Sequence, residues 1–490
     1  MPKRYLLAID QGTTSTRAVL FDADAKPCVA HAIELAQIYP ANGWVEHDPE
    51  EIWKAVVACC RAVLQGIDPK DIAGIGITNQ RETTLVWERE TGKPLYNAIV
   101  WQDRRTAEHC AALKAKGLEG RVTKRTGLLL DPYFSATKAA WILDHVPKAR
   151  TRAQAGELCF GTVDSWLIYK LTAGRLHATD VTNASRTLLL DLARLEWDDE
   201  MLSLFEVPRA MLPDVRDSSG HFGETGLFGA SIPILGDAGD QQAATFGQAC
   251  FAKGDVKSTY GTGCFALVNT GADLPSSANK LLATCAWRIG KETVYAIEGS
   301  IFIAGAVVQW LRDGLGIIRG ADDIEALVAR AKPADGLYFV PAFTGLGAPY
   351  WDPQARGAIL GLTRDTGAAE IARAALDSVC FQTSDLLAAM ARDMGEMPKR
   401  LKVDGGMVKN DWFCQRLADL TGLEVDRPKV TETTALGAAY LAGRAAGVFK
   451  DMPDIAARWG LDRRFEPKLA NAARDRLAKG WQKAVARVRS

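Results

Sequence analysis

The chain has 490 residues, more than one hydrophobic core normally supports, because cores stop growing near about 250–300 residues. Apolar residues make up 48% and charged residues 24%, which argues against a disordered or fibrous chain. Lys plus Arg and Asp plus Glu each total 59, so the net charge is zero and no broad basic field for nucleic acid or anionic lipid exists.

The ten cysteines predict reduced, mostly buried thiols, because no two form a Cys-x-x-Cys pair and no secretion signal accompanies them. The apolar run Tyr5–Ile9 ends at Asp10, short of the roughly 7–15 residues that a signal peptide needs. No stretch approaches the roughly 18 apolar residues of a membrane span. We therefore expect a cytoplasmic protein.

The first half of the chain begins as strand, polar turn, strand. Asp48 is a plausible N-cap for the helix that follows, and Pro49 suits its first position. The predicted elements are strands at 5–9, 16–21, 72–78 and 85–87 and a helix at 49–65.

The opening pattern recurs in the second half, where Gly261-Thr-Gly263 joins two further strands. The predicted elements here are strands at 255–260, 264–269 and 401–403, helices at 300–313, 369–391, 411–421 and 433–446, and a polar helical tail after about 450. Within the helix at 433–446, Gly437-Ala-Ala439 indicates close packing. The recurrence predicts two related α/β domains facing each other, 1–250 and 251–490, with a boundary near 249–254.

Two phosphate-binding motifs can be tested directly. A P-loop requires Gly-Lys followed by Ser or Thr, whereas Gly92-Lys93 precedes Pro and Gly290-Lys291 precedes Glu. Residues 261–266 match the dinucleotide fingerprint, but that motif must open a helix and this segment continues as a strand. The sequence therefore disfavours a dehydrogenase.

The two Gly/Thr turns offer another way to hold phosphate. Glycine lets the backbone approach a phosphate closely and form concave groups of N–H donors. The candidates are Gly12, Gly261 and Gly263 with the hydroxyls of Thr13, Thr14, Ser15 and Thr262 and the guanidinium of Arg17. Each turn alone is also explained as an Asx-type turn beside strand-forming threonines. Their equivalent places in the two halves favour phosphate binding.

A third glycine-rich segment, Asp404-Gly-Gly406, leads into a helix that Asn410 can cap. A helix N-terminus behind such a loop suits an α-phosphate or a ribose. An ordinary loop with a helix cap explains the same residues.

Two acidic residues, Asp240 and Glu82, are candidates for activating or binding a polyol hydroxyl. Asp240 precedes a helix, where an N-cap role would keep it ionised and available as a base that activates a hydroxyl. In Arg81-Glu82, a guanidinium that only donates hydrogen bonds lies next to a carboxylate that only accepts them, and each polyol hydroxyl can do both. Such an adjacent pair of opposite charges is usually a solvated surface pair. Trp101 and Phe265 are either core residues or walls for the carbon face of a small polyol.

Five segments together resemble the glycerol-phosphorylating branch of the FGGY carbohydrate kinase family: Ile9–Arg17, Asn79–Thr84, Ile99–Arg105, Ala238–Gln242 and Tyr260–Phe265. Two wider family signatures match as well, at Tyr133–Lys138 with Trp141 and at Gly357–Leu362 with 370–377. The matches run from about residue 5 to 447 in the family's order.

The resemblance implies two actin-like (ribonuclease H-like) α/β domains, each a mixed five-stranded sheet flanked by helices, with the active site in the cleft between them. It implies phosphorylation of glycerol by ATP to sn-glycerol 3-phosphate, the first step of glycerol catabolism, with Mg²⁺ required. It also implies a homo-oligomer, a dimer or tetramer, with no nucleic-acid partner.

Residue roles also follow from the resemblance. Nucleotide contacts are expected from Thr13, Thr14, Ser15, Arg17, Thr262, Gly305, Gln309, Gly406 and Asn410. Triol contacts are expected from Arg81, Glu82, Trp101, Tyr133, Asp240, Gln241 and Phe265. Asp240 resembles the general base, and Asp10 with Asp240 resembles the family's magnesium site.

The chain departs from some bacterial members in its regulatory segments. The loop Gly223–Ser231 has no basic residue, so we expect weak or no control by fructose 1,6-bisphosphate. His221 lies near a phosphorylatable histidine of other members with different spacing, and we expect a plain exposed histidine. Two alternatives stay open, namely a family member acting on xylulose, gluconate or a similar sugar, and an actin-like ATPase that forms filaments or acts as a chaperone.

Overall fold

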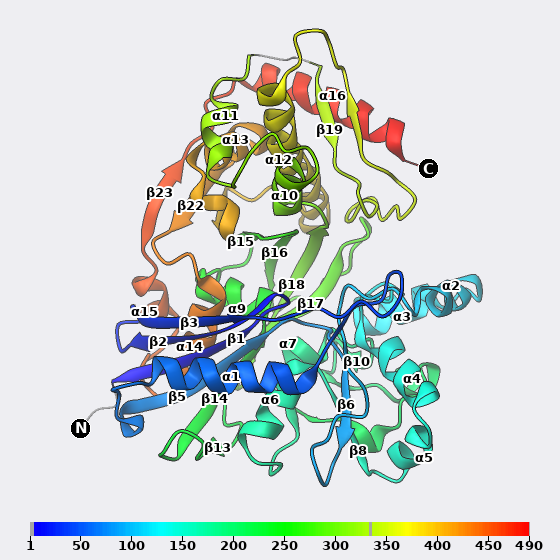
Figure 1. Cartoon of the computed structure of the whole chain (residues 1–490), viewed down its shortest axis with the longest axis vertical. Coiled ribbons are helices and arrows are strands. Elements are labelled where there is room, and N and C mark those ends of the chain that lie inside the picture. The colour runs from blue at the N-terminus through cyan, green and yellow to red at the C-terminus, as the bar shows by residue number, and fades with distance from the viewer. Residues whose placement is uncertain (1–3, 333–335, 490) are drawn as a thin grey trace.

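The structure is a computed structural model that describes residues 4–332 and 336–489. Its elements form two α/β halves. The first lies in the lower part of Figure 1, blue to green, and most of the second lies above it, green to red. No helix among the described residues combines the length and apolarity needed to cross a membrane.

Six strands form the first sheet, in the order β13-β14-β5-β1-β2-β3. Their bounds are β1 Tyr5–Gln11, β2 Ser15–Asp22, β3 Pro27–Glu34, β5 Ile72–Asn79, β13 Glu224–Thr225 and β14 Ile232–Gly239. Strand β5 is buried along its whole length, as its continuous run of apolar and small residues requires.

Seven strands form the second sheet, in the order β17-β18-β16-β15-β21-β22-β23. Their bounds are β15 Val256–Tyr260, β16 Cys264–Gly271, β17 Leu282–Ile289, β18 Glu292–Ile301, β21 Arg400–Asp404, β22 Glu424–Pro428 and β23 Leu461–Phe465.

The two sheets share one five-stranded arrangement. In β3-β2-β1-β5-β14 and in β18-β16-β15-β21-β22, two antiparallel pairings are followed by two parallel ones. The hairpins β1–β2 and β15–β16 therefore occupy equivalent places, which confirms the predicted repeat. The expected count of five strands describes this shared part, and β13, β17 and β23 extend the sheet edges.

The helices are α1 Pro49–Val63, α2 Ala107–Ala115, α3 Glu119–Thr126, α4 Ser135–His145, α5 Ala149–Gln154, α6 Val163–Leu171, α7 Val181–Ala184, α8 Asp199–Leu204, α9 Asp240–Gly247, α10 Gly305–Asp313, α11 Asp323–Val328, α12 Ala368–Met394, α13 Asp411–Thr421, α14 Thr433–Ala445, α15 Met452–Arg458 and α16 Asn471–Val488. Short strands complete the chain: β4 Glu46–His47, β6 Leu85–Glu88, β7 Ala98–Ile99, β8 Leu158–Gly161, β9 Ala178–Asp180, β10 Leu190–Asp191, β11 Glu196–Trp197, β12 Asp214–Arg216, β19 Tyr338–Val340 and β20 Ala358–Leu360. Helices α2–α5 gather beside the short strands at the right of Figure 1, whereas helices such as α1, α12, α13 and α14 pack on the two sheets.

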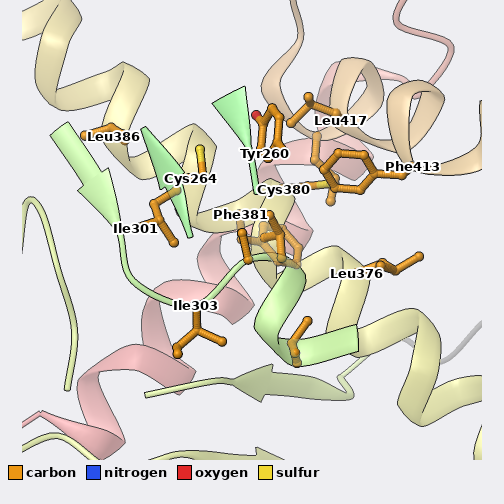
Figure 2. Close-up of a cluster of buried hydrophobic side chains, with 14 of the residues drawn as sticks. Tyr260, Cys264, Ile301, Ile303, Leu376, Cys380, Phe381, Leu386, Phe413 and Leu417 are labelled. Atoms are coloured by element: carbon orange, nitrogen blue, oxygen red, sulfur yellow. The ribbon is translucent and has the colours of Figure 1, made fainter. Parts of the chain in front are cut away.

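The core of the second half fixes the base of its Gly/Thr turn. Figure 2 shows Tyr260 and Cys264, which flank that turn, among apolar side chains of α12 and α13. The rings of Tyr260 and Phe413 lie 5.2 Å apart, edge to face. Because both strand ends are anchored in this core, the turn between them is held in place.

Helices α9 and α14 pack closely against each other and on the first sheet. A Cβ at Gly437 would lie 1.8 Å from the Ala243 carbonyl oxygen, and one at Gly247 would lie 2.0 Å from that of Thr433. Only glycine permits this approach, which confirms the close packing predicted for 437–439.

Most predicted elements are present, with two corrections. The helix expected at 300–313 begins at Gly305, because residues 300–301 pair with β16 as the end of β18. The tail is not wholly helical, because β23 pairs with β22.

Asp48 does cap α1, accepting from the Glu50 N–H at 2.8 Å. All ten cysteines are free thiols, nine of them buried and Cys28 exposed.

Candidate active site

The two Gly/Thr turns lie at corresponding ends of their hairpins. In the first, the Gly12 N–H donates to the Ser15 carbonyl at 2.9 Å. In the second, the Gly261 N–H donates to the Gly263 carbonyl at 2.9 Å. No helix follows the second turn, since β16 begins at Cys264, which confirms that this is not a dinucleotide-binding motif.

The predicted nucleotide residues of the second half line one cavity of about 450 Å³. It contains Thr262, Gly305, Gln309, Gly406 and Asn410. A Cβ built at Gly406 meets no atom within 4 Å, so this glycine faces open space. Asn410 caps α13 by accepting from the Phe413 N–H at 2.9 Å, and since both residues line the cavity, the helix N-terminus lies at its wall.

Arg17 and Asp10 lie opposite each other on β2 and β1, beside the first turn. Arg17 forms an ion pair with Glu432, the residue before α14. Burial raises the pKa of Asp10 to about 7, with further increases from Asp240 and Glu432 and a decrease from Arg17. Three carboxylates therefore gather near one cation, an environment that favours an added positive charge.

The predicted triol residues form a second cluster beside the first turn. Arg81 Nε lies 3.1 Å from Asp240 Oδ1. The ring of Trp101 lies 5.7 Å from that of Tyr133 and 6.1 Å from that of Phe265, both edge to face. The structure thus brings together polar and aromatic groups separated by more than a hundred residues.

Glu82 adopts a left-handed backbone conformation, with φ of 61°. Such a conformation is costly for a residue with a side chain and persists only where its surroundings enforce it. Here Ser135 Oγ and Lys138 Nζ donate to the Glu82 carbonyl at 3.0 and 3.3 Å. The family signature around Tyr133 therefore supports the Glu82 peptide.

The expected N-cap role of Asp240 is wrong by one position. Gly239 is the N-cap of α9 and Asp240 is its first residue, accepting from the Gln241 N–H at 2.7 Å. Burial raises the pKa of Asp240, while Arg81 and Lys257 oppose the increase. The sequence predicted that N–H donors of the helix would keep Asp240 ionised, which lowers its pKa. Burial raises that pKa by more, so the net change is upward.

Comparisons with known proteins identify the family. The models of the N-terminal and C-terminal domains of the FGGY family of carbohydrate kinases match residues 5–247 and 256–446. The chain belongs to this family.

The chain is similar over nearly its whole length to two glycerol kinases and a gluconate kinase. The glycerol kinase of Methylobacterium nodulans is 60% identical over 489 residues, covering 98% of this chain and 97% of that one. The structure of Plasmodium falciparum glycerol kinase with ADP is 37% identical, with a TM-score of 0.93, covering 99% of this chain and 98% of that one. The gluconate kinase of Lactobacillus acidophilus is 25% identical, with a TM-score of 0.86 and coverage of 99% and 96%.

Among the described residues, no cluster of three or more His, Cys, Asp and Glu side chains is arranged to hold a metal by protein ligands alone. An FGGY kinase does not require one, because Mg²⁺ in such sites is bound by one or two carboxylates together with substrate phosphates. Asp10 and Asp240 remain the candidates.

Four charged residues of the site were not predicted from the sequence. Arg186 and Glu298 contact the Arg81-Glu82 pair, Lys257 Nζ donates to Gln241 Oε1 at 2.5 Å, and Glu432 pairs with Arg17. A buried Glu within the apolar strand β18 is the one local signal that could have found Glu298.

The loop Gly223–Ser231 has a neighbouring cation that was not predicted from the sequence. Arg175 Nη2 donates to the Glu224 carbonyl at 3.0 Å, so a cation from elsewhere in the chain does adjoin the loop Gly223–Ser231. His221 is exposed, as expected.

Proposed function

We propose that the protein transfers the γ-phosphoryl group of ATP to a terminal hydroxyl of glycerol, giving sn-glycerol 3-phosphate. The observation that carries the proposal is the hydrogen bond from Trp101 Nε1 to Thr13 Oγ1, 2.8 Å long. It fastens the wall of the polyol site to the first phosphate turn, so an acceptor hydroxyl and a terminal phosphate bound there would adjoin. Full-length similarity to glycerol kinases supports the same assignment.

Glycerol binds where hydrogen-bond donors and acceptors of the protein lie side by side. The Arg81 guanidinium offers donors only and the Glu82 carboxylate acceptors only, whereas each hydroxyl of the triol does both. Tyr133 and Gln241 supply further polar atoms. Trp101 and Phe265 cover the carbon chain, which excludes water from the reacting hydroxyl.

Asp240 acts as the general base. Its contacts with Arg81 and Gln241 both use Oδ1, and no donor within the described part of the chain reaches Oδ2. The side chain is 30% exposed, so Oδ2 is available to accept the proton of the attacking hydroxyl. Phosphoryl transfer depends mainly on positioning and charge neutralisation, with the base contributing about 10²–10⁴-fold.

The phosphates of ATP lie between the two turns. Thr13, Thr14, Ser15 and Arg17 bind them from the first half, and the residues around the 450 Å³ cavity hold the nucleotide from the second. Mg²⁺ fits this arrangement, because Asp10 and Asp240 present oxygen ligands in a region already rich in negative charge. When bound through water by these two residues, it would neutralise charge on the phosphate oxygens.

Four further expectations stay predictions. They are the domain boundary between residues 1–250 and 251–490, the homo-oligomer, the cytoplasmic location and the absence of control by fructose 1,6-bisphosphate.

Glycerol-dependent release of ADP tests the proposal, with xylulose and gluconate measured in parallel. We expect the highest kcat/KM with glycerol. A pentulose or gluconate preferred over glycerol would assign the protein to another branch of the family. Release of ADP that no polyol or sugar stimulates would favour the actin-like ATPase.

A further inference from the structure

Beneath the proposed triol site, four buried side chains form a ring of alternating charge. Arg186 Nε donates to Glu82 Oε1 at 2.6 Å, and Arg186 Nη2 donates to Glu298 Oε1 at 2.9 Å. Glu298 in turn accepts from Arg81, with its Oε1 3.0 Å from Nη2 and its Oε2 in contact with Nη1. Arg81 Nε and Glu82 Oε1, 3.9 Å apart, close the ring.

The ring joins the two halves of the molecule. Arg81 and Glu82 follow β5 of the first sheet, whereas Glu298 belongs to β18 of the second. All four side chains are at most 2% exposed. On the same sheet, β18 pairs with β16, where Phe265 faces the polyol site.

Glu298 determines which edge of the Arg81 guanidinium faces the reacting groups. A guanidinium has five donors in one plane, and a carboxylate that grips Nη1 and Nη2 fixes that plane. With both Nη atoms held by Glu298, the remaining Nε lies on the side of Asp240, 3.1 Å from its Oδ1. Arg186 performs the same task for Glu82, since its Nε holds Oε1 of that carboxylate.

Stability alone does not explain four buried charges. Removing two ion pairs from water carries a large desolvation cost, and well-packed apolar residues often serve a fold equally well. Although burial alone would raise it, Arg186 and Arg81 hold the pKa of Glu298 below its usual value, so the carboxylate stays charged in the ring.

We propose that Glu298 and Arg186 are positioning residues for the polyol substrate, fixing Arg81 and Glu82 respectively. The inference rests on the proposed function, because Arg81 and Glu82 are the groups that bind the triol. It follows that a carboxylate of the second sheet completes a binding site built on the first.

The test compares KM for the polyol with KM for ATP. Glu298→Gln keeps the shape and removes the charge that holds both guanidinium groups. We expect KM for glycerol to rise about tenfold or more, because a buried charged hydrogen bond is lost, while KM for ATP changes less than about threefold. Glu298→Asp keeps the charge and should recover part of the loss. Arg186→Lys, which cannot grip both carboxylates in one plane, should raise KM for glycerol as well.

Asp377→Asn is the matched control. It breaks another mostly buried pair, in which Arg416 donates to Asp377 at 2.6 and 2.9 Å, between α12 and α13 and away from the polyol site. We expect a lower melting temperature with KM for glycerol unchanged. If Glu298→Gln does not fold, Glu298→Asp and Arg186→Lys decide the question.

Folded variants at Glu298 and Arg186 whose KM for glycerol stays within twofold of the unmodified protein would overturn the proposal. The proposal would also be overturned if these variants raised KM for glycerol, relative to KM for ATP, no more than Asp377→Asn does. If the unmodified protein prefers another polyol or sugar, the proposed function fails, yet a selective rise in KM for that substrate would still support positioning. A protein that turns over no member of the panel would overturn both.

Discussion

Asp240 experiences opposing electrostatic effects that together suit a base. Burial raises the pKa of its carboxyl group, whereas Arg81, Lys257 and the Gln241 N–H lower it. A carboxylate with a raised pKa accepts a proton more readily than an exposed one, and its positive neighbours keep the charged form accessible. The site therefore strengthens the base, and Arg81 and Lys257 limit the increase in its pKa.

Asp240→Asn should separate binding from catalysis. The amide oxygen can still accept from the Gln241 N–H and lie beside Arg81, but it cannot take the proton of the hydroxyl. We expect kcat to fall about 10²–10⁴-fold, while affinities for glycerol and ATP, measured by isothermal titration, stay close to those of the unmodified protein. A variant with near-normal kcat would remove Asp240 from the mechanism.

At the residue scale, the sequence reveals contacts only where they belong to a contiguous motif. Arg81, Glu82 and Asp240 lie in short polar segments next to strands, so their role could be predicted. Glu298 is 217 positions from Arg81, and only the pairing of the second sheet brings it there. The N-cap prediction failed by one residue because helix ends cannot be placed more finely from sequence.

At the scale of elements, the contact between α9 and α14 depends on glycine. Gly437 lies where its neighbour is backbone rather than a movable side chain. Backbone atoms cannot yield without displacing the whole helix, so this position has little tolerance for added volume.

Gly437→Ala should therefore destabilise the fold by about 3 kcal/mol or more. The added Cβ would lie 1.8 Å from the Ala243 oxygen, which forces the helices apart. Gly120→Ala is the matched control, since Gly120 lies within α3 and a Cβ there meets no atom within 4 Å. Thermal unfolding should show a lower melting temperature for the first variant and an equal or higher one for the second. Equal melting temperatures would contradict the close packing.

A half-buried histidine beside β9 makes stability depend on pH. Burial lowers the pKa of His177 to about 4, although its hydrogen bond to the Phe160 carbonyl opposes this. Between about pH 6.5 and 4 the unfolded chain binds a proton that the folded chain excludes, so stability falls as pH falls through this window. The loss from this group is on the order of 2 kcal/mol.

His177→Gln should flatten that dependence, because glutamine keeps an N–H donor for Phe160 and does not titrate. Urea midpoints at pH 7, 6 and 5 would measure it, with His31→Gln on the exposed strand β3 as the control. We expect the midpoint of the His177 variant to fall less with acid than that of the control. Parallel curves would show that another group dominates.

The sequence predicts those elements whose pattern is local. Both hairpins and α13 were predicted because turn residues and caps mark their ends. Strand β3 is exposed almost throughout, so it lacks the apolar alternation by which strands are recognised. Strand β23 depends on pairing with β22, where Arg464 meets Asp426, and this tertiary contact has no signature of its own.

At the scale of the whole molecule, one helix of the second half packs on the sheet of the first half. Helix α14 lies between β22 and β23 of the second sheet in sequence, yet it packs on β1, β5 and β14 of the first. Relative movement of the halves must therefore involve α9 and α14. Closure of the two halves over bound substrates would exclude water and so protect ATP from hydrolysis.

The ion pair between Arg17 and Glu432 uses a residue that we assign to phosphate binding. Glu432, just before α14, binds Arg17 on β2. The Glu432 side chain is 53% exposed, so the pair is worth at most about 1 kcal/mol. Even so, Glu432 competes with the phosphates for the same guanidinium and adds negative charge near Asp10.

Glu432→Gln should therefore lower KM for ATP, by up to about fivefold at low ionic strength, and leave KM for glycerol unchanged. The effect should shrink as salt is added, because exposed charges are screened. Asp24→Asn is the matched control, since Asp24 pairs with Arg458 at 3.3 Å and also joins the β2–β3 hairpin to α15 away from the phosphate turns. Steady-state kinetics at 20 and 200 mM salt would compare the two variants. If both shift KM for ATP equally, or if Glu432→Gln raises it, Glu432 supports the nucleotide site instead of competing with its ligand.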